Sequence, residues 1–224
     1  MSAKGEIKIL STPQYLQLQI IKELRPKIVT AFNKSVPLIK SFVVNHIKSV
    51  VNTDFSFRSM QNGELRAEMG FEDGKKIVDA ITRELLQELE VKIDNSSFDR
   101  NGIDISLGVR FIDTDFVGIL NMPEASYISV SERGVSKVKW AEWLILEGYS
   151  VVVRDFYIDY NLTIEESRRS RSGLALMRPD KRQNYRVPMG FAGTKDNNFI
   201  TRAFEKSEVV IADKISEIFM GAIK

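Results

Sequence analysis

The stretch Ile103-Asp-Ile-Ser-Leu-Gly-Val-Arg-Phe111 decides the fold class, because apolar and polar residues alternate along it without interruption. Successive side chains of a strand point to opposite faces, so this pattern predicts an antiparallel strand with one buried and one solvated face. The turn-forming residues 99–102 precede it, and residues 91–93 are its expected hairpin partner. On both sides of this region the apolar residues return to a helical period.

The chain before this strand is predicted to be mainly helical. Pro26 and Pro37 interrupt the pattern, so we expect a kinked helix or consecutive helices between about residues 14 and 52. In the last part, apolar residues recur at three- and four-residue spacing and predict a buried stripe. The stripe consists of Ile39, Val43, Ile47 and Val50.

Two further helices are expected before residue 90. The first covers residues 59–69 and is closed by Gly70, a residue that favours helix C-termini. Asp73 can then cap the second. His46 lies on or beside the buried stripe of the preceding helix, and we interpret it as a hydrogen-bonded structural residue rather than a ligand.

The second half of the chain predicts short strands followed by a helix. We expect strands at 115–121, 127–130 and 151–160, a short helix at 137–147 and, after the capping residues Asn197 and Asn198, a C-terminal helix.

This order predicts an α+β fold, with a mostly antiparallel β-sheet flanked by N-terminal helices and one C-terminal helix. No linker is rich enough in Pro, Gly or Ser to divide the chain, so we expect a single domain over residues 1–224. Its expected parts are a flexible N-terminus (1–12), a mainly helical part (14–90), a part of strands and loops (91–196) and the C-terminal helix (197–221).

Composition excludes several kinds of chemistry. The 224 residues include no cysteine, which excludes a disulfide framework, a thiolate nucleophile and a zinc ribbon. A single histidine, His46, excludes most histidine-based catalytic and metal sites. No apolar run approaches the ~20 residues of a membrane span, and the N-terminus lacks the apolar segment of a secretory signal. We therefore expect a cytoplasm-like compartment and no membrane partner.

The segment 168–186 is unusually basic. Seven basic residues and one acidic residue give it a charge of +6, so the rest of the chain carries −4 against a total of +2. This charge indicates an anionic partner, either a phosphate backbone or an acidic protein surface. The alternative is a solvated loop balanced by carboxylates of the same chain, such as Glu165 and Glu166. The basic residues are Arg168, Arg169, Arg171, Arg178, Lys181, Arg182 and Arg186.

Neighbouring carboxylates are the one pattern that suggests catalysis. Pairs of acids can hold Mg²⁺ or act as general acid and base, but close pairs are expected by chance among 30 acidic residues. We therefore assign no catalytic, metal or cofactor-binding residue, and a metal-dependent hydrolase stays a minor alternative that Asp155→Asn would test. The pairs are Asp113/Asp115, Asp155/Asp159 and Glu165/Glu166.

Two tryptophans, Trp140 and Trp143, lie three residues apart next to Leu144. Packing in the core is the first interpretation of this apolar cluster. An inter-subunit contact is the alternative, because tryptophan is enriched at interface hot spots.

Several segments between residues 55 and 205 resemble the neck or tail-completion proteins of tailed bacteriophages, the structural family that connects head and tail. Residues 62–70 (NGELRAEMG) are similar to a T-G-x-L-R-type motif of the family, with Asn62 in place of Thr or Ser. The other matching segments are 140–148 (WAEWLILEG), 170–177 (SRSGLALM), 185–194 (YRVPMGFAGT) and 196–203 (DNNFITRA).

This resemblance implies a structural protein that catalyses no reaction. It also implies a ring, expected to be a hexamer that matches the tail symmetry, between portal or adaptor proteins and tail-tube or tail-terminator proteins. Closed rings use heterologous interfaces, and the basic segment of such a ring would face either the DNA channel or an acidic neighbour. The expected location is the virion, after assembly in the cytoplasm of the bacterial host. The alternative is a DNA-associated accessory protein that binds the phosphate backbone through residues 168–186.

Overall fold

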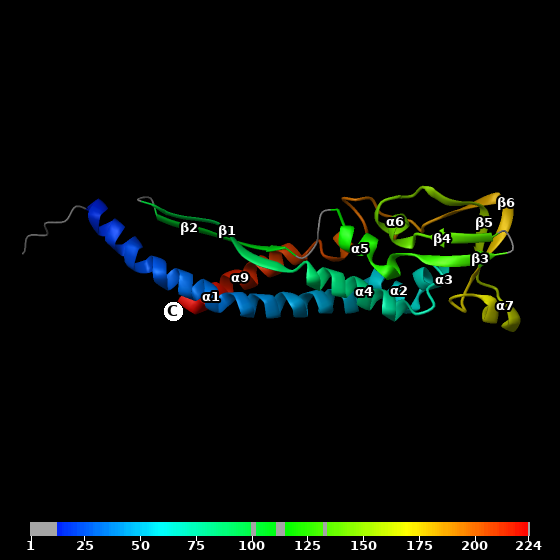
Figure 1. The fold of residues 1–224 in the computed structure, drawn as a ribbon, viewed down its shortest axis with the longest axis horizontal. Coiled ribbons are helices and arrows are strands. Elements are labelled where there is room, and N and C mark those ends of the chain that lie inside the picture. Colours follow the sequence, from blue (N-terminus) through cyan, green and yellow to red (C-terminus); the bar gives the residue numbers. More distant parts are fainter. Residues whose placement is uncertain (1–12, 100–101, 111–114, 132–133, 224) are drawn as a thin grey trace, which may run out of the picture. The chain divides into compact units, whose positions relative to one another are not determined.

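The computed structural model describes residues 13–99, 102–110, 115–131 and 134–223 (Figure 1). The predicted α+β class is confirmed: long and short helices accompany antiparallel strands, which form three separate two-stranded sheets. The contacts divide the chain into two compact units. The expectation of a single domain stays a prediction.

The first unit contains the larger part of α1 (Pro13–Thr53), up to Ser41, and the hairpin of β1 (Glu90–Asp99) and β2 (Gly102–Arg110). It also contains the later part of α9 (Ser207–Ile223), from Ala212 onwards. The hairpin predicted from the alternating stretch is confirmed, except that Phe111 lies outside the described residues.

Helix α1 contains both prolines and does not break at either. The first of the two expectations, one bent helix, therefore holds, and Figure 1 shows the bend in the blue part of the ribbon. A proline inside a helix removes one backbone hydrogen bond and displaces the preceding turn. The helix then bends, but it continues when the hydrogen bonds of the neighbouring turns are kept.

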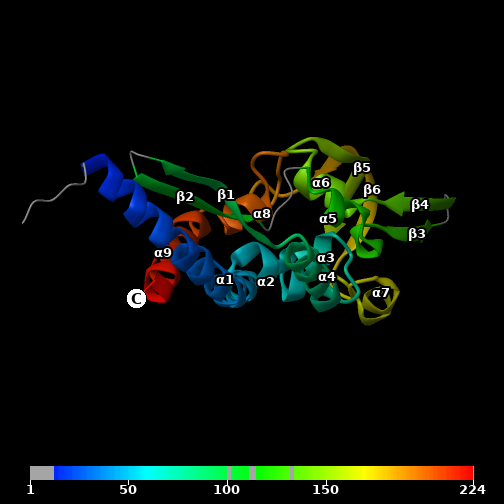
Figure 2. The same ribbon diagram turned by 60° about the vertical axis from the view of Figure 1, so that its left-hand side comes forward.

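The second unit contains the rest of the described chain (Figure 2). Its elements are the end of α1, then α2 (Phe55–Asn62), α3 (Glu64–Glu68), α4 (Gly74–Gln87), α5 (Val117–Asn121), the 3-10 turn η1 (Pro123–Ala125), β3 (Tyr127–Ser131), β4 (Gly134–Val138), α6 (Trp140–Ile145), β5 (Val151–Asp159), α7 (Ile164–Arg169), β6 (Leu176–Arg186), α8 (Phe199–Ala203) and the start of α9.

Aromatic side chains pack against one another in the core of this unit, among many buried aliphatic residues. Phe57 and Phe199 pack edge to face at 5.5 Å, and Phe71 packs in the same way on Trp140 at 4.9 Å. Trp140 and Leu144 are fully buried, whereas Trp143 is half-buried. Burial of this size contributes roughly 1.5–3 kcal/mol for each large apolar side chain. The structure therefore places Trp140 in the core, and an interface role for Trp143 stays a prediction.

Two of the expected elements are wrong in type or extent. Residues 117–121 form helix α5 instead of a strand, because a short apolar run fits either structure and its buried residue, Ile119, does not reveal the period. The predicted helix 137–147 is the shorter α6, and its first residues belong to strand β4, which pairs with β3.

Two of the expected helices are each divided. The helix predicted at 59–69 becomes α2 and α3, separated at Gly63, whose added Cβ would lie 2.8 Å from the Ser59 Cα. The C-terminal helix becomes α8 and α9. Asn198 caps α8 as predicted, since its side chain accepts hydrogen bonds from the backbone N–H groups of Ile200 and Thr201.

Candidate functional site

The end of α3 is held in place by a tyrosine from β3. The hydroxyl of Tyr127 donates a 2.7 Å hydrogen bond to the carbonyl of Met69, just before the chain turns at Gly70. Gly70 has a φ of +65°, and a Cβ there would lie 3.0 Å from the Tyr127 hydroxyl. The turn therefore needs glycine for both its backbone conformation and the close approach.

The turn after α7 is held by two serine hydroxyls, one of which bonds it to α3. Ser170 Oγ donates to the carbonyl of Ala175 at 2.6 Å, and Ser172 Oγ donates to the carbonyl of Ala67 at 3.4 Å. Both serines are buried. These bonds leave the intervening Arg171 exposed, with its guanidinium carbon 4.0 Å from the centre of the Tyr127 ring. The cation–π contact orients a charge that would otherwise move freely.

Trp140 connects α6 to the same place. Its indole N–H donates a 2.6 Å hydrogen bond to the carbonyl of Glu124 in η1, and its ring supports Phe71. Three segments that carry the family resemblance therefore meet in one part of the second unit, because residues 62–70, 140–148 and 170–177 all contact Phe71, Tyr127 or their neighbours.

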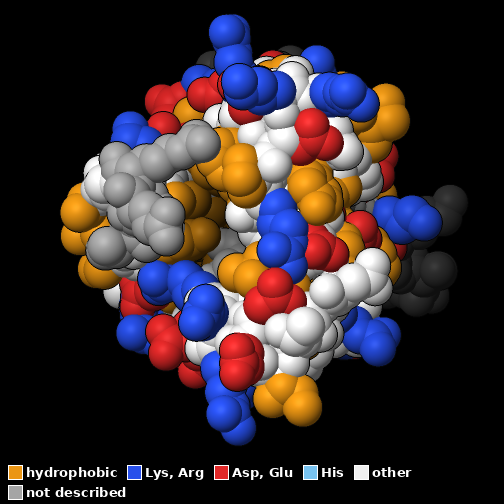
Figure 3. Space-filling model, turned by 90° about the vertical axis from the view of Figure 1, so that its right-hand side faces the viewer, with side chains coloured by type: hydrophobic (Ala, Val, Ile, Leu, Met, Phe, Trp, Pro, Cys, Tyr) orange, Lys and Arg blue, Asp and Glu red, His pale blue; other side chains and the backbone are white. Residues whose placement is uncertain are grey.

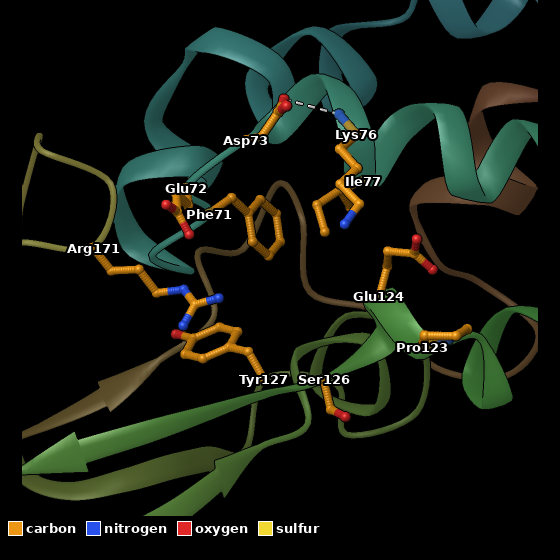
Figure 4. A pocket seen from close by; sticks show the side chains of 10 residues that line it. All are labelled: Phe71, Glu72, Asp73, Lys76, Ile77, Pro123, Glu124, Ser126, Tyr127 and Arg171. Atoms are coloured by element: carbon orange, nitrogen blue, oxygen red, sulfur yellow. Dashed lines mark hydrogen bonds between the residues drawn. The ribbon is translucent and has the colours of Figure 1, made fainter.

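A pocket of about 260 Å³ lies where these segments meet (Figure 4). Figure 4 shows Phe71 between Arg171 on one side and Lys76 and Ile77 on the other, with η1 and the start of β3 opposite. The lining residues are Phe71, Glu72, Asp73, Lys76, Ile77, Pro123, Glu124, Ser126, Tyr127 and Arg171.

The acidic groups of this pocket are partly used by the fold. The Asp73 carboxylate accepts the backbone N–H of Lys76 at 3.0 Å and caps α4, as predicted. Glu124 Oε2 is buried without a hydrogen bond and lies 3.5 Å from the guanidinium of Arg83. In contrast, neither Lys76 nor Arg171 lies within ion-pair distance of a carboxylate in the described part of the chain.

Beside the pocket, a carboxylate of α3 joins that helix to the residue after β5 and to strand β6. Glu68 accepts hydrogen bonds from the hydroxyls of Tyr160 at 2.6 Å and Tyr185 at 2.9 Å. Burial raises the pKa of Glu68, although both phenol bonds act in the opposite direction. Burial also raises the pKa of Tyr185, with Glu68 adding to the effect, so the hydroxyl stays protonated and continues to donate.

Arg178 is the one basic residue of segment 168–186 that forms ion pairs with described residues. It lies on β6, where it contacts Asp159 at 2.5 Å and Glu166 at 2.7 Å. The backbone N–H of Thr163, together with Arg178, lowers the pKa of Glu166 to about 2. The backbone N–H of Asn161, together with Arg178, lowers the pKa of Asp159. One part of the predicted self-neutralisation is therefore present, through Glu166 but not Glu165.

The other basic residues of this segment are exposed. Arg186 donates to the carbonyl of Tyr149 at 2.6 Å, and its guanidinium lies near that ring. Figure 3 shows lysine and arginine side chains spread over the face at the right-hand side of Figure 1, with acidic and apolar groups between them. The exposed residues without a described carboxylate in ion-pair distance are Arg168, Arg169, Arg171, Lys181, Arg182 and Arg186.

Each suspected carboxylate pair contains a member that is already ion-paired, namely Asp115, Asp159 or Glu166. Asp113 lies outside the described residues, and Asp115 forms an ion pair with Lys195. Asp155 has a φ of +61° on an exposed bulge of β5. In the described part of the chain, no three His, Asp or Glu side chains are grouped as metal ligands.

His46 is hydrogen-bonded, as predicted. Its Nε2 lies 2.8 Å from the hydroxyl of Ser207, and its ring stacks on Phe42 with centroids 5.9 Å apart. Burial lowers the pKa of His46, so the ring is neutral over a wider pH range than a free histidine.

Comparison with known proteins does not identify the chain. It matches no model of a protein family, no curated protein and no solved structure. Among the helices of the described residues, none is long and apolar enough to cross a bilayer.

Sequence reasoning did not find the pocket. Of the lining residues it singled out Arg171 and, as a helix cap, Asp73, but not Phe71, Lys76 or Tyr127, which no motif marks. Two features of the sequence could have pointed to the pocket: the glycine at position 70 and the serines around Arg171. Both residue types indicate turns of defined backbone conformation.

Proposed function

We propose that the chain is a virion structural protein of a tailed bacteriophage. It would be a neck or tail-completion ring subunit that joins the portal side of the head to the tail around the DNA channel. On this proposal it catalyses no reaction and assembles as a hexamer in the host cytoplasm. Its partners are copies of itself, portal or adaptor proteins, and tail-tube or tail-terminator proteins, with non-specific DNA contact.

One observation carries this proposal: the segments that resemble the family hold one another together through structural bonds. Segment 170–177 is bonded to segment 62–70 through the Ser172 hydroxyl and the Ala67 carbonyl, and segment 185–194 is bonded to segment 62–70 through the Tyr185 hydroxyl and the Glu68 carboxylate. Segment 140–148 is bonded to segment 185–194, because the Gly148 N–H donates to the Gly193 carbonyl. These bonds fix the elements that carry the exposed cations. A rigid unit with cations presented outward suits a protein whose task is assembly.

A second candidate, a DNA-associated accessory protein, is favoured by the exposed cations alone. Six of the seven basic residues of segment 168–186 are exposed, and the groups on α7 and on the outer part of β6 have no described carboxylate partner. Cations in this state release counterions when they meet a phosphate backbone, without reading the base sequence.

Co-assembly tests the leading proposal. The full chain would be expressed with the portal, adaptor and tail-tube proteins encoded beside it, and purified complexes would be imaged by negative-stain electron microscopy. Rings of this chain bound to a portal or tail partner are the expected result. A monomer that joins none of these partners under any assembly condition contradicts the proposal.

A salt titration separates the second candidate from the first. An accessory DNA-binding protein should bind duplex DNA with submicromolar affinity at low salt, and the logarithm of affinity should fall linearly with the logarithm of salt concentration. Arg168→Gln, Arg169→Gln and Arg171→Gln together should abolish that binding. Weak binding by the free subunit, little changed by these substitutions, argues against the accessory role.

A further inference from the structure

The pocket beside Phe71 rests on a packed aromatic pair, Phe71 and Trp140. Two of its lining residues, Arg171 and Lys76, are cations that no described carboxylate neutralises. We propose that the pocket binds a carboxylate side chain from an acidic segment of a partner protein. The carboxylate would lie between Arg171 and Lys76, and a neighbouring apolar group would contact Phe71 and Ile77. This inference rests on the proposed function in one respect only, that the chain meets partner proteins.

Arg171 is already held in a binding position. Its backbone lies between two buried serines that are bonded to carbonyls, and its guanidinium stacks on Tyr127. Tyr127 is fixed in turn by its bond to Met69. A guanidinium placed in this way presents its remaining N–H donors to a ligand, and its planar fork matches the two oxygens of a carboxylate.

Lys76 supplies the second charge. It lies in the first turn of α4, and its side chain is exposed without a carboxylate of the described residues in ion-pair distance. The neighbouring Lys75 differs, since its ammonium pairs with Asp79 at 3.0 Å one turn along the helix. The chain therefore neutralises the lysine that faces away from the pocket and leaves the lining lysine available.

Size and lining indicate a side chain as the occupant. At about 260 Å³ the pocket is smaller than the roughly 300–1,000 Å³ of typical small-molecule sites. Its apolar lining residues are Phe71, Ile77, Pro123 and the ring of Tyr127. Such walls accept one acidic side chain together with part of an apolar neighbour.

The acids around the pocket disfavour a DNA backbone. Glu72, Asp73 and Glu124 all line it, so a polyanion with closely spaced charges would be repelled at several points. A single carboxylate between the two cations avoids most of this repulsion. The exposed Arg168 and Lys181, in contrast, are not among the lining residues and remain available for phosphate.

A cationic occupant is disfavoured as well. Glu124 already faces Arg83, and the Asp73 carboxylate caps α4. Glu72 is then the lining acid whose carboxylate forms no hydrogen bond or ion pair with the described residues, whereas neither of the two lining cations is paired with a described carboxylate. The balance of available charge therefore selects an anion.

Nuclear magnetic resonance titration of the full chain tests this inference. The probes are the capped peptide acetyl-Ala-Phe-Glu-Ala-amide, its Phe-Gln counterpart, 3-phenylpropionate and a short DNA duplex. We expect the glutamate peptide to shift the Phe71, Ile77 and Tyr127 signals saturably and to bind more tightly than 3-phenylpropionate. Arg171→Gln and Lys76→Gln should each weaken it about tenfold, the usual effect of losing one charge-assisted hydrogen bond.

Two matched controls keep the result specific. Arg168→Gln removes an equally exposed arginine outside the pocket, and Lys75→Gln removes the neighbouring lysine, so neither should change peptide affinity by more than about twofold. Arg171→Lys, which keeps the charge but not the fork, should bind with intermediate affinity. Circular dichroism of each variant confirms that the folded chain is being compared.

Three results overturn the inference. If the glutamine peptide binds as tightly as the glutamate peptide, the pocket does not recognise a carboxylate. If 3-phenylpropionate binds more tightly than the glutamate peptide, the ligand is a free small acid and not a partner protein. If DNA binds more tightly and shifts the same signals, the ligand is a phosphate backbone. Peptide binding by a chain that never forms rings contradicts the proposed function but not this inference. Ring assembly without peptide binding contradicts only the inference.

Discussion

The charged residues of the pocket and those of the paired strands β5 and β6 differ in their partners. On β6, Arg178 forms ion pairs with Asp159 of β5 and Glu166 of α7. At the pocket, Arg171 stacks on an aromatic ring and meets no described carboxylate. Both arginines belong to one basic segment of the sequence, so proximity in sequence does not give them the same role.

The difference shows what each region contributes. The ion pairs of Arg178 hold strand β6, which also carries exposed cations, whereas aromatic packing at the pocket holds Arg171 without neutralising its charge. Exposed ion pairs add little to stability, whereas burial of aromatic side chains adds much. Substitution of the buried aromatic residues that support the pocket, such as Trp140, should therefore disturb the fold more than substitution of Arg178 on β6.

The largest expected effect comes from Trp140→Ala. This change leaves a cavity below Phe71 and removes the N–H donor to the Glu124 carbonyl, so the free energy of unfolding should fall by about 3–5 kcal/mol. Denaturant unfolding followed by circular dichroism measures it. Trp143→Ala, at a half-buried position, is the matched control, and an equal loss there would contradict the core role of Trp140.

Tyr185→Phe should cost less, about 1.5–3 kcal/mol, because it removes one hydrogen bond to a half-buried carboxylate. Since that bond lowers the pKa of Glu68, the variant should raise this pKa further. A raised carboxyl pKa means that stability falls as pH rises from the ordinary value of 4.5 through the folded value. Unfolding measured across this range should therefore show a steeper fall in the variant, and an unchanged pH dependence would refute the coupling.

Arg178→Gln is expected to change the pKa of the neighbouring Glu166 carboxyl and thereby the pH dependence of stability. In the native chain, the stabilising effect of the Glu166 carboxylate is present above its ordinary pKa of 4.5 and is lost as pH falls toward about 2. Without the guanidinium, its pKa should rise but stay below 4.5, because the Thr163 N–H still donates. Carboxyl carbon resonances followed by titration report this directly, with Arg182→Gln as the control.

The smallest effect is expected from Asp155→Gly on the bulge of β5. Asp155 has a φ of +61°, a conformation that favours glycine, and its N–H donates to the Asn184 side chain. Glycine keeps that donor and relieves the backbone, so stability should rise by less than about 1 kcal/mol. Thermal unfolding of Asp155→Gly and Asp155→Ala tests this prediction. Alanine keeps the strained backbone conformation, so Asp155→Ala should not raise the stability.

Local patterns predicted the parts of the fold that depend on local physics. Alternation over residues 103–111 predicted the first hairpin, and Asp73 and Asn198 predicted two helix starts, because capping is decided within one turn. The strand predicted over residues 115–121 was wrong, because an apolar run as short as residues 117–121 does not reveal whether its period is that of a strand or a helix. Strand β6 was not predicted as a strand, because Pro179 and the charges around it hide the pairing with β5.

The candidate site, too, was only partly predictable from the sequence. The sequence marked Arg171, since a basic segment is visible in composition, but Lys76 lies almost a hundred residues away and looks like any surface lysine. Glu68 was not marked either, because its hydrogen bonds come from Tyr160, which follows β5, and from Tyr185 on β6, both distant in sequence.

The sequence by itself determined the α+β class, the helix caps and the separation of a +6 segment from a −4 remainder, because these follow from composition and from neighbours within a few residues. Only the tertiary structure decided which of those cations are neutralised. Arg178 meets two carboxylates from other elements, whereas Arg171 meets the face of Tyr127. The physical reason is that ion pairing needs groups within about 4 Å, a distance set by long-range packing and not by order along the chain.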